Sequence, residues 1–165
     1  TIEDVAALAF ASDAPLAFLT QTTLSVDDTA AIIAAIKARF PDVSGPKAED
    51  ICYATSNRQE AVTRIAPASD LVLVIGAPNS SNSLRLVEVA ERMGTPARLI
   101  QRAAELMPQW FDGVQTLGLT AGASAPEELV REVIARLGEF HDIREEETIS
   151  ARETITFKLP RQLTD

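Results

Sequence analysis

A continuous apolar run at residues 71–75, Leu-Val-Leu-Val-Ile, constrains the fold of this chain more than any other feature. An uninterrupted run of this length predicts a strand buried on both faces, as in a parallel sheet. Gly76 and Pro78 end the run, and the polar turn at 79–83, Asn-Ser-Ser-Asn-Ser, opens a predicted helix. Because the free N–H groups of a helix's first turn favour negative charge, this turn predicts an anion site. Its candidate ligands are Ser80, Ser81, Asn82 and Ser83.

From residue 50 onward, strand and helix patterns alternate at regular intervals. This alternation predicts an α/β fold with a parallel sheet and right-handed crossover connections. Strands are predicted at 70–75, 96–100 and 116–120, with an edge strand at 154–159, and helices at 57–65, 83–93 and 101–110. Ser56 and Gln59 have the spacing of a capping box at the start of the first of these helices. A further helix is predicted between Ser124 and Gly138, with Ser124 as its N-cap and Glu127 completing a capping box.

Residues 1–46 carry weaker signals. A helix is predicted at 1–11, with Thr1 and Asp4 spaced as a capping pair, and another at 26–40, with a capping box formed by Ser25 to Asp28. A short strand is predicted at 16–19, and residues 44–47 form the candidate linker. One strand cannot make a sheet, so we expect either that preceding residues complete a unit here or that this segment packs onto the rest as extra layers. Thr1 stands where an initiator Met would be expected, which favours a chain that begins partway along a longer protein.

The predicted fold class is therefore α/β, with two small units of parallel sheet flanked by helices. The expected division is a partial α/β unit at 1–46, an α/β unit carrying the anion-binding turns at 47–140, and a C-terminal tail with an edge strand at 141–165.

Charge and composition narrow the partners. The net charge of −9 opposes binding to phosphate backbones and anionic lipid, so neither nucleic acid nor a membrane is an expected partner. No apolar stretch approaches the roughly 18–20 residues that span a bilayer, and the N-terminus lacks the pattern of a signal peptide, so we expect a cytoplasmic protein. The single cysteine, Cys52, cannot alone fill an iron–sulfur site, which needs about four ligands. It is either a small core side chain or one ligand of a shared site.

Hydroxyl and amide groups gather at predicted turns at 22–23, 52–57, 79–83 and 121–124. Ligands of open parallel sheets bind beyond the carboxyl ends of the strands, so these turns could together form a donor-rich cup for a diphosphate or similar anion. Ser and Thr are also common helix caps, each worth about 1 kcal/mol, so any single turn has a purely structural explanation. The pattern alone reaches an anion-binding α/β protein and leaves open which turns bind and which only cap.

Stretches of this chain resemble the motifs of the 4-hydroxy-3-methylbut-2-enyl diphosphate reductases, which catalyse the last step of the methylerythritol phosphate route to isoprenoids. They are Gln-Thr-Thr-Leu-Ser-Val-Asp-Asp-Thr at 21–29, Ile-Cys-Tyr-Ala-Thr-Ser-Asn-Arg-Gln at 51–59, Asn-Ser-Ser-Asn-Ser at 79–83 and Thr-Ala-Gly-Ala-Ser-Ala-Pro at 120–126. The resemblance implies a reductive dehydroxylation that gives isopentenyl and dimethylallyl diphosphate at a four-iron four-sulfur cluster, with ferredoxin or flavodoxin as electron donor.

The resemblance also implies roles for individual residues. Cys52 matches the last of the three cysteines that hold the cluster in this family, and Thr22 matches a threonine near the reacting hydroxyl. Thr55 matches a polar residue that lines the cavity. The residues that match the diphosphate ligands or lie beside them are Ser80, Ser81, Asn82 and Ser124.

The chain also departs from the family pattern. The family's two earlier cysteines, its diphosphate-binding histidines and its catalytic glutamate lie upstream of the matched portion, and Ser56 stands where Thr is common. The family fold implies three similar α/β units around a central cavity, of which this chain would supply part of the second and the third. We therefore expect a fragment that keeps part of the diphosphate cup but holds no cluster and is inactive alone. The alternative is a non-catalytic α/β module that binds a phosphate ligand.

Overall fold

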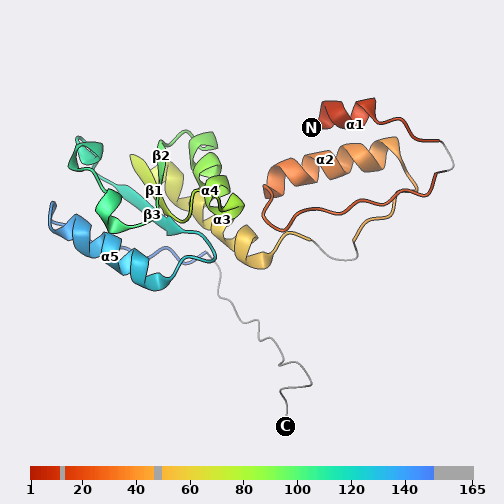
Figure 1. Ribbon diagram of the computed structural model, residues 1–165. Helices are drawn as coiled ribbons and strands as arrows, with labels where there is room; N and C mark the ends of the chain where they lie inside the picture. Colours follow the sequence, from red (N-terminus) through yellow and green to blue (C-terminus); the bar gives the residue numbers. More distant parts are fainter. Residues whose placement is uncertain (12–13, 47–49, 151–165) are drawn as a thin grey trace, which may run out of the picture.

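The structure, a computed structural model, describes residues 1–11, 14–46 and 50–150. Its centre is a three-stranded parallel sheet with the strand order β2-β1-β3. The strands are β1 (Leu71–Ile75), β2 (Ala97–Ile100) and β3 (Leu117–Ala121). Helices α3 (Tyr53–Ile65) and α4 (Ser81–Arg92) lie on one face and α5 (Glu127–Gly138) on the other (Figure 1). The predicted α/β class is confirmed, and the sheet strands lie close to their predicted positions.

The central strand β1 explains the apolar run, because every residue of it is buried. Leu71, Leu73 and Ile75 pack toward α5, in a cluster that includes Val133 and Leu137. Val72 and Val74 pack toward α3 and α4, in a second cluster that includes Val62, Leu86 and Ala90. Burial of each such side chain stabilises the fold by about 1.5–3 kcal/mol. The sheet is therefore anchored on both faces, and its carboxyl edge is held in a defined position.

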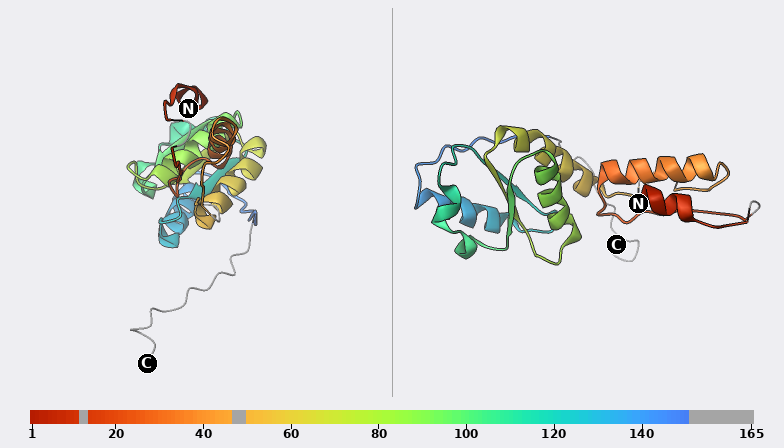
Figure 2. Two further views of the ribbon diagram at one scale, coloured as in Figure 1. Left: turned by 90° about the vertical axis from the view of Figure 1, so that its right-hand side faces the viewer. Right: turned by 90° about the horizontal axis from the view of Figure 1, so that it is seen from above.

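Residues 1–46 form a different arrangement. Helix α1 (Ile2–Ala7) packs against α2 (Val26–Arg39), and both lie beyond α3 and away from the sheet (Figures 1 and 2). Among the described residues, the predicted strand at 16–19 is limited to one parallel bridge, Ala17 with Ser44, and Leu19 is 84% exposed. The described part of this segment therefore contributes helices and an extended stretch, with no sheet of its own.

Several helix starts were predicted correctly because their capping signals are local. The capping box of Thr1 and Asp4 is present, and the Ser25 hydroxyl accepts a hydrogen bond from the Asp28 N–H at 3.2 Å. Gly94 follows α4 with φ +87°, a conformation that favours glycine. The first helix is shorter than predicted, because Leu8 is already extended.

Prolines overturn two predictions. The helix expected at 101–110 is instead a pair of short 3₁₀ turns, Ala103–Glu105 and Pro108–Phe111, since Pro108 disfavours helical backbone at the residue before it. Ser124 is not the N-cap of α5: that position is Pro126, and no side chain caps the helix. Pro126 favours extended backbone before it in the same way, so the helix begins only at Glu127.

Two other helices begin earlier than predicted. Helix α3 starts at Tyr53 with Cys52 at the N-cap position, so Ser56 lies inside the helix and does not cap it. Helix α4 starts at Ser81, with Ser80 as the N-cap.

The remaining predictions concern the tail and the membrane. The edge strand predicted at 154–159 lies outside the described residues, and residues 139–150 form no regular element. Across the described ranges, no helix has the length and apolar character needed to cross a bilayer.

Candidate functional site

The N-terminus of α4 lies where β1 ends, so the polar run at 79–83 sits at the carboxyl edge of the sheet. The Ser80 hydroxyl caps the helix by accepting a hydrogen bond from the Ser83 N–H at 3.3 Å. The Ser83 hydroxyl in turn donates to Ser80 Oγ at 3.1 Å. Two of the candidate ligands are therefore bonded to each other, and Ser80 has a structural role whether or not it binds an anion.

Ser83 also joins the two glycine turns at this edge. It is 1% exposed and fills the space beside Gly76 and Gly122, where a Cβ atom on either glycine would collide with the Ser83 hydroxyl. The Gly122 N–H donates to the Ile75 carbonyl at 2.8 Å. The turns after β1 and β3 and the first turn of α4 are thus packed together.

Asn82 is the unusual residue of this group. It is 7% exposed, and both its amide oxygen and its amide nitrogen are buried without a hydrogen-bond partner among the described residues. A Cβ at Gly122 would lie 3.7 Å from Asn82 Nδ2, so the amide faces the turn after β3. A buried polar group left unpaired lowers the stability of the fold by about 1–3 kcal/mol, and in folded proteins nearly all such groups have a hydrogen-bond partner. An anion at the helix N-terminus is a partner of the right chemistry for the amide N–H groups.

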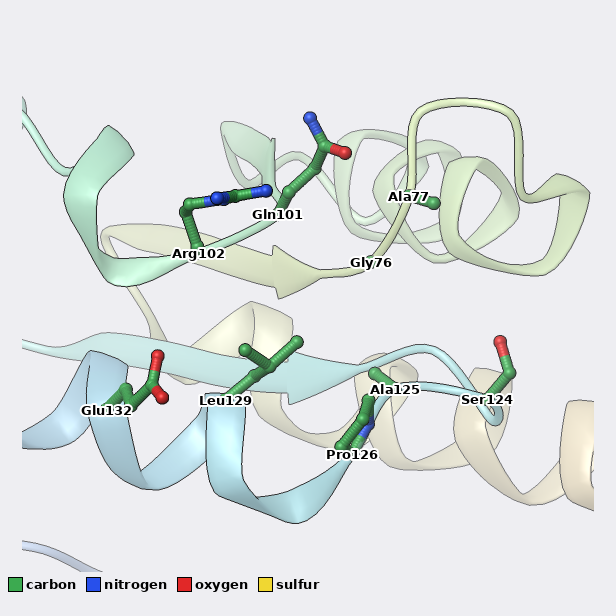
Figure 3. A pocket seen from close by; sticks show the side chains of 9 residues that line it. All are labelled: Gly76, Ala77, Gln101, Arg102, Ser124, Ala125, Pro126, Leu129 and Glu132. Atoms are coloured by element: carbon green, nitrogen blue, oxygen red, sulfur yellow. The ribbon is translucent and has the colours of Figure 1, made fainter.

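Ser124 lines an open pocket of about 380 Å³, and none of Ser80, Ser81, Asn82 and Ser83 is among the residues that line it. The pocket lies between the ends of β1 and β2 and the start of α5, and its lining includes Gly76, Ala77, Arg102, Ser124, Leu129 and Glu132. Figure 3 shows Ser124 at one end of the pocket and Arg102 and Glu132 at the other. The turns after β1 and β3 therefore share one pocket, as expected if strand ends converge. Ser81, in contrast, is exposed on the first turn of α4.

A second group brings Thr22 and Cys52 together. The Cys52 N–H donates to the Thr22 carbonyl at 3.1 Å, and both side chains are exposed. Cys52 is a free thiol at the start of α3 and makes no capping bond. Thr55, one turn further on, is 2% exposed, and its N–H donates to the Cys52 carbonyl at 2.8 Å. The predicted catalytic threonine and the predicted metal ligand are thus neighbours.

Cys52 is the candidate metal ligand in this part of the site. An exposed thiol with no other partner suits a role as one metal ligand. Within 1–11, 14–46 and 50–150, no group of three or more His, Cys, Asp and Glu side chains could hold a metal ion. Cys52 therefore fits as a single ligand of a shared site and needs partners from elsewhere.

Comparison with known proteins decides the family. The sequence profile of the LytB protein family matches residues 1–138. This chain belongs to the LytB family. It is 56% identical over 160 residues to the 4-hydroxy-3-methylbut-2-enyl diphosphate reductase of Pseudomonas aeruginosa (strain LESB58), with 97% of this chain and 51% of that protein covered. It is 51% identical over 162 residues to the reductase of the same name from Mannheimia succiniciproducens, with 98% and 52% covered.

Solved LytB-family structures agree with the fold. The E-1-hydroxy-2-methyl-but-2-enyl-4-diphosphate reductase of Plasmodium falciparum matches 98% of this chain and 51% of its own, with a TM-score of 0.88 and 33% identity. A second structure, of (E)-4-hydroxy-3-methyl-but-2-enyl diphosphate reductase, matches 84% of this chain and 48% of its own, with a TM-score of 0.53 and 33% identity. The chain thus spans about half the length of the relatives it matches.

Pattern analysis of this LytB-family chain missed some residues that shape the site. The sequence pattern indicates Gly76 and Gly122 only as turn residues, and their close approach to Ser83 becomes visible only in three dimensions. The same pattern indicates Gln59 only as the partner of Ser56 in a capping box. In the structure its side chain instead bonds the backbone on both sides of Ser25.

Proposed function

We propose that this chain is part of a reductase that converts 4-hydroxy-3-methylbut-2-enyl diphosphate to isopentenyl and dimethylallyl diphosphate. The observation that carries the proposal is the buried, unpartnered Asn82 amide at the start of α4, beside the turn that leads to Ser124. Membership of a family whose matched relatives carry that name supports the substrate class. The chain covers 51% of the length of the Pseudomonas aeruginosa reductase, so the proposed activity is that of a full-length protein of this family.

In this proposal the chain's own residues bind and orient the diphosphate. Asn82 donates its amide N–H groups to phosphate oxygens, and Ser80, Ser81 and Ser124 supply hydroxyls around the same anion. The N-terminal end of α4 contributes its free N–H groups and the positive end of its dipole, so the site needs no lysine or arginine beside the anion. Thr55 lines the substrate cavity, and Thr22 lies near the allylic hydroxyl that leaves as water.

The cofactor of the complete enzyme is a four-iron four-sulfur cluster, to which Cys52 contributes one thiolate. When bound, the cluster would pass two electrons, one at a time, from an external electron donor to the substrate, which would take up two protons and lose water. The other cluster ligands would come from the part of the protein outside these residues. In the full protein, residues 1–46 and 47–140 would belong to the second and third of three α/β units around the substrate. We further propose ferredoxin or flavodoxin as electron donor and the cytoplasm as the location.

The test uses the full-length protein and inorganic pyrophosphate as a probe of the diphosphate site. Asn82→Leu is expected to weaken pyrophosphate binding about 10- to 100-fold by calorimetry, because hydrogen bonds to a charged ligand are lost. The same change should raise the free energy of unfolding without ligand by up to about 1–3 kcal/mol, since an unpaired buried amide disappears. Unchanged pyrophosphate affinity would refute the site.

The matched control is Thr95→Val. The Thr95 hydroxyl is also buried but donates to the Ala66 carbonyl at 2.7 Å, so its loss should lower stability and leave pyrophosphate binding intact. Reconstitution with iron and sulfide separates the two candidate functions. The full-length protein should gain cluster absorbance that Cys52→Ser weakens, and the 165-residue chain should show no stable cluster. Pyrophosphate binding without any cluster in the full-length protein would instead support the phosphate-binding module.

A further inference from the structure

The segment 20–26, which turns at 22–24 and ends on the first residue of α2, is held alongside residues 50–59 by side-chain and backbone hydrogen bonds. The Thr20 N–H donates to Asp50 Oδ2 at 2.9 Å, and the Cys52 N–H donates to the Thr22 carbonyl at 3.1 Å. Further along, Gln59 Nε2 donates to the Leu24 carbonyl at 2.9 Å and Gln59 Oε1 accepts from the Val26 N–H at 3.1 Å. These contacts join parts of the chain that are 33 and 35 residues apart at Gln59.

Gln59 is the buried member of these contacts. It is 6% exposed, and both its amide oxygen and its amide nitrogen are paired, unlike those of Asn82. Val26 is the first residue of α2, so its N–H has no acceptor inside the helix and Gln59 supplies one. Removal of the Gln59 amide would leave the Leu24 carbonyl and the Val26 N–H unpaired in a partly buried place. Such groups are expensive to leave unpaired, so the segment would have to move.

We propose that Gln59 is a positioning residue that holds the Thr22 segment against the start of α3, so that Thr22 stays beside Cys52. The inference rests on the proposed function of Thr22 and Cys52, and Gln59 itself touches neither the substrate nor the cluster. Its two hydrogen bonds lie on either side of Ser25, the N-cap of α2, which leaves the segment just before it little freedom to slide. The side chains of Cys52 and Thr22 are exposed, and the part-buried Gln59 bonds hold the backbone on which the bond from Cys52 to Thr22 depends.

The first test is a double-mutant cycle in the full-length, cluster-loaded protein. Gln59→Leu is expected to lower kcat about 10- to 100-fold with KM changed less than about threefold, because a catalytic group is misplaced while the diphosphate turns stay intact. In a Thr22→Ala background, Gln59→Leu should lower kcat by less than about twofold, since residues that act through one another are not additive. Gln59→Glu keeps the acceptor for Val26 but loses the donor to Leu24, so an intermediate effect is expected. Additive effects of Gln59→Leu and Thr22→Ala on kcat would overturn the proposal. If Gln59→Leu does not fold, the same double-mutant cycle with Gln59→Glu decides.

The second test needs no activity. In the full-length protein, peptides covering 20–26 and 50–56 should exchange their amide hydrogens at least about tenfold faster in Gln59→Glu, because opening of this segment becomes easier. Thr95→Val, which breaks a buried bond elsewhere, should leave both peptides unchanged. Unchanged exchange in the Gln59 variant would show that the segment is held without it. If the wild-type protein neither binds a cluster nor turns over, the proposed function fails, whereas the exchange measurement still decides whether Gln59 holds the segment.

Discussion

Alanine at Gly76 and at Gly122 should have different consequences, although both glycines face Ser83. A Cβ at Gly122 would meet the Ser83 hydroxyl but stay 3.6 Å from Ser83 Cβ, an ordinary contact distance. A Cβ at Gly76 would meet the hydroxyl and also lie 2.6 Å from Ser83 Cβ, which rotation of the side chain cannot move. Only the Gly122 collision can therefore be relieved by moving or removing one oxygen atom.

The magnitudes follow from what must give way. In Gly122→Ala the Ser83 hydroxyl rotates and loses its bond to Ser80, which costs about 0.5–1.5 kcal/mol. In Gly76→Ala the strand end or α4 must shift, which costs about 1–3 kcal/mol as overpacking of a dense core does. Neither glycine has a positive φ, so alanine adds no backbone strain and lowers the entropy of the unfolded chain, worth about 0.4–1 kcal/mol in its favour.

Ser83→Ala is the decisive second change. Combined with Gly122→Ala it removes the colliding oxygen, so the double variant should be at least as stable as Ser83→Ala alone. Combined with Gly76→Ala it removes the oxygen collision but leaves the Cβ collision in place, so recovery of stability should be at most partial. Thermal unfolding of the full-length protein measures this, since 1 kcal/mol corresponds to about 2–4 °C for a unit of this size. Equal recovery at both glycines, or at neither, would contradict the packing described for Ser83.

Other changes test separate parts of the structure. Ser124→Ala should change the free energy of unfolding by less than about 0.5 kcal/mol because Ser124 caps no helix, whereas Ser80→Ala should lower it by about 1 kcal/mol. Both variants should weaken pyrophosphate binding in calorimetry. A loss of stability in Ser124→Ala as large as in Ser80→Ala would show that Ser124 is a cap after all. The bidentate hydrogen bond from Arg92 lowers the pKa of Asp28. The stability that this pair contributes is therefore present at neutral pH. It is lost as the pH falls from the ordinary aspartate pKa through the lowered pKa of Asp28. Because both side chains are about half exposed, Arg92→Met should cost under about 1 kcal/mol at pH 7 and remove that acid dependence in urea titrations at several pH values. The N–H groups of Thr116 and Gln115, both 2.9 Å from Asp70 Oδ2, lower the pKa of Asp70. Asp70→Asn should therefore make the free energy of unfolding fall less steeply on acidification. A pKa of Asp70 at or above the usual aspartate value in an NMR titration would contradict these two hydrogen bonds.

The parts of the fold that could be predicted are those whose causes lie close together in the sequence. The β1 run was predictable because burial on both faces requires five apolar residues in succession, and the caps at Thr1 and Ser25 were predictable because donor and acceptor are three residues apart. The helix expected at 101–110 and the cap expected at Ser124 failed where a proline prevailed over an otherwise helical pattern. Local signals decide local structure, unless a stronger local constraint opposes them.

The site depends on contacts that no local pattern contains. Gln59 bonds backbone groups 33 and 35 residues away, and Ser83 packs against glycines in two different turns. A residue such as Gln59 looks like any polar helix residue until its partners are known. The resemblance to the reductase family points to these turns, but it could not say which polar side chains hold the fold and which remain available to a ligand.

The run of polar residues at 79–83 shows how that separation works. Ser80 caps α4, Ser83 packs between the glycine turns, and Ser81 is exposed to solvent, so each of these hydroxyls has a use or costs nothing in the fold alone. Asn82 is buried, and its amide has no hydrogen-bond partner in the part of the chain that the structure describes, so the fold by itself would be more stable with an apolar residue of the same size there. A side chain that costs stability at the N-terminus of a helix, beside a second converging turn, is best explained by a ligand that pairs with it. The proposal of a diphosphate site therefore rests on Asn82 more than on the larger number of serines around it.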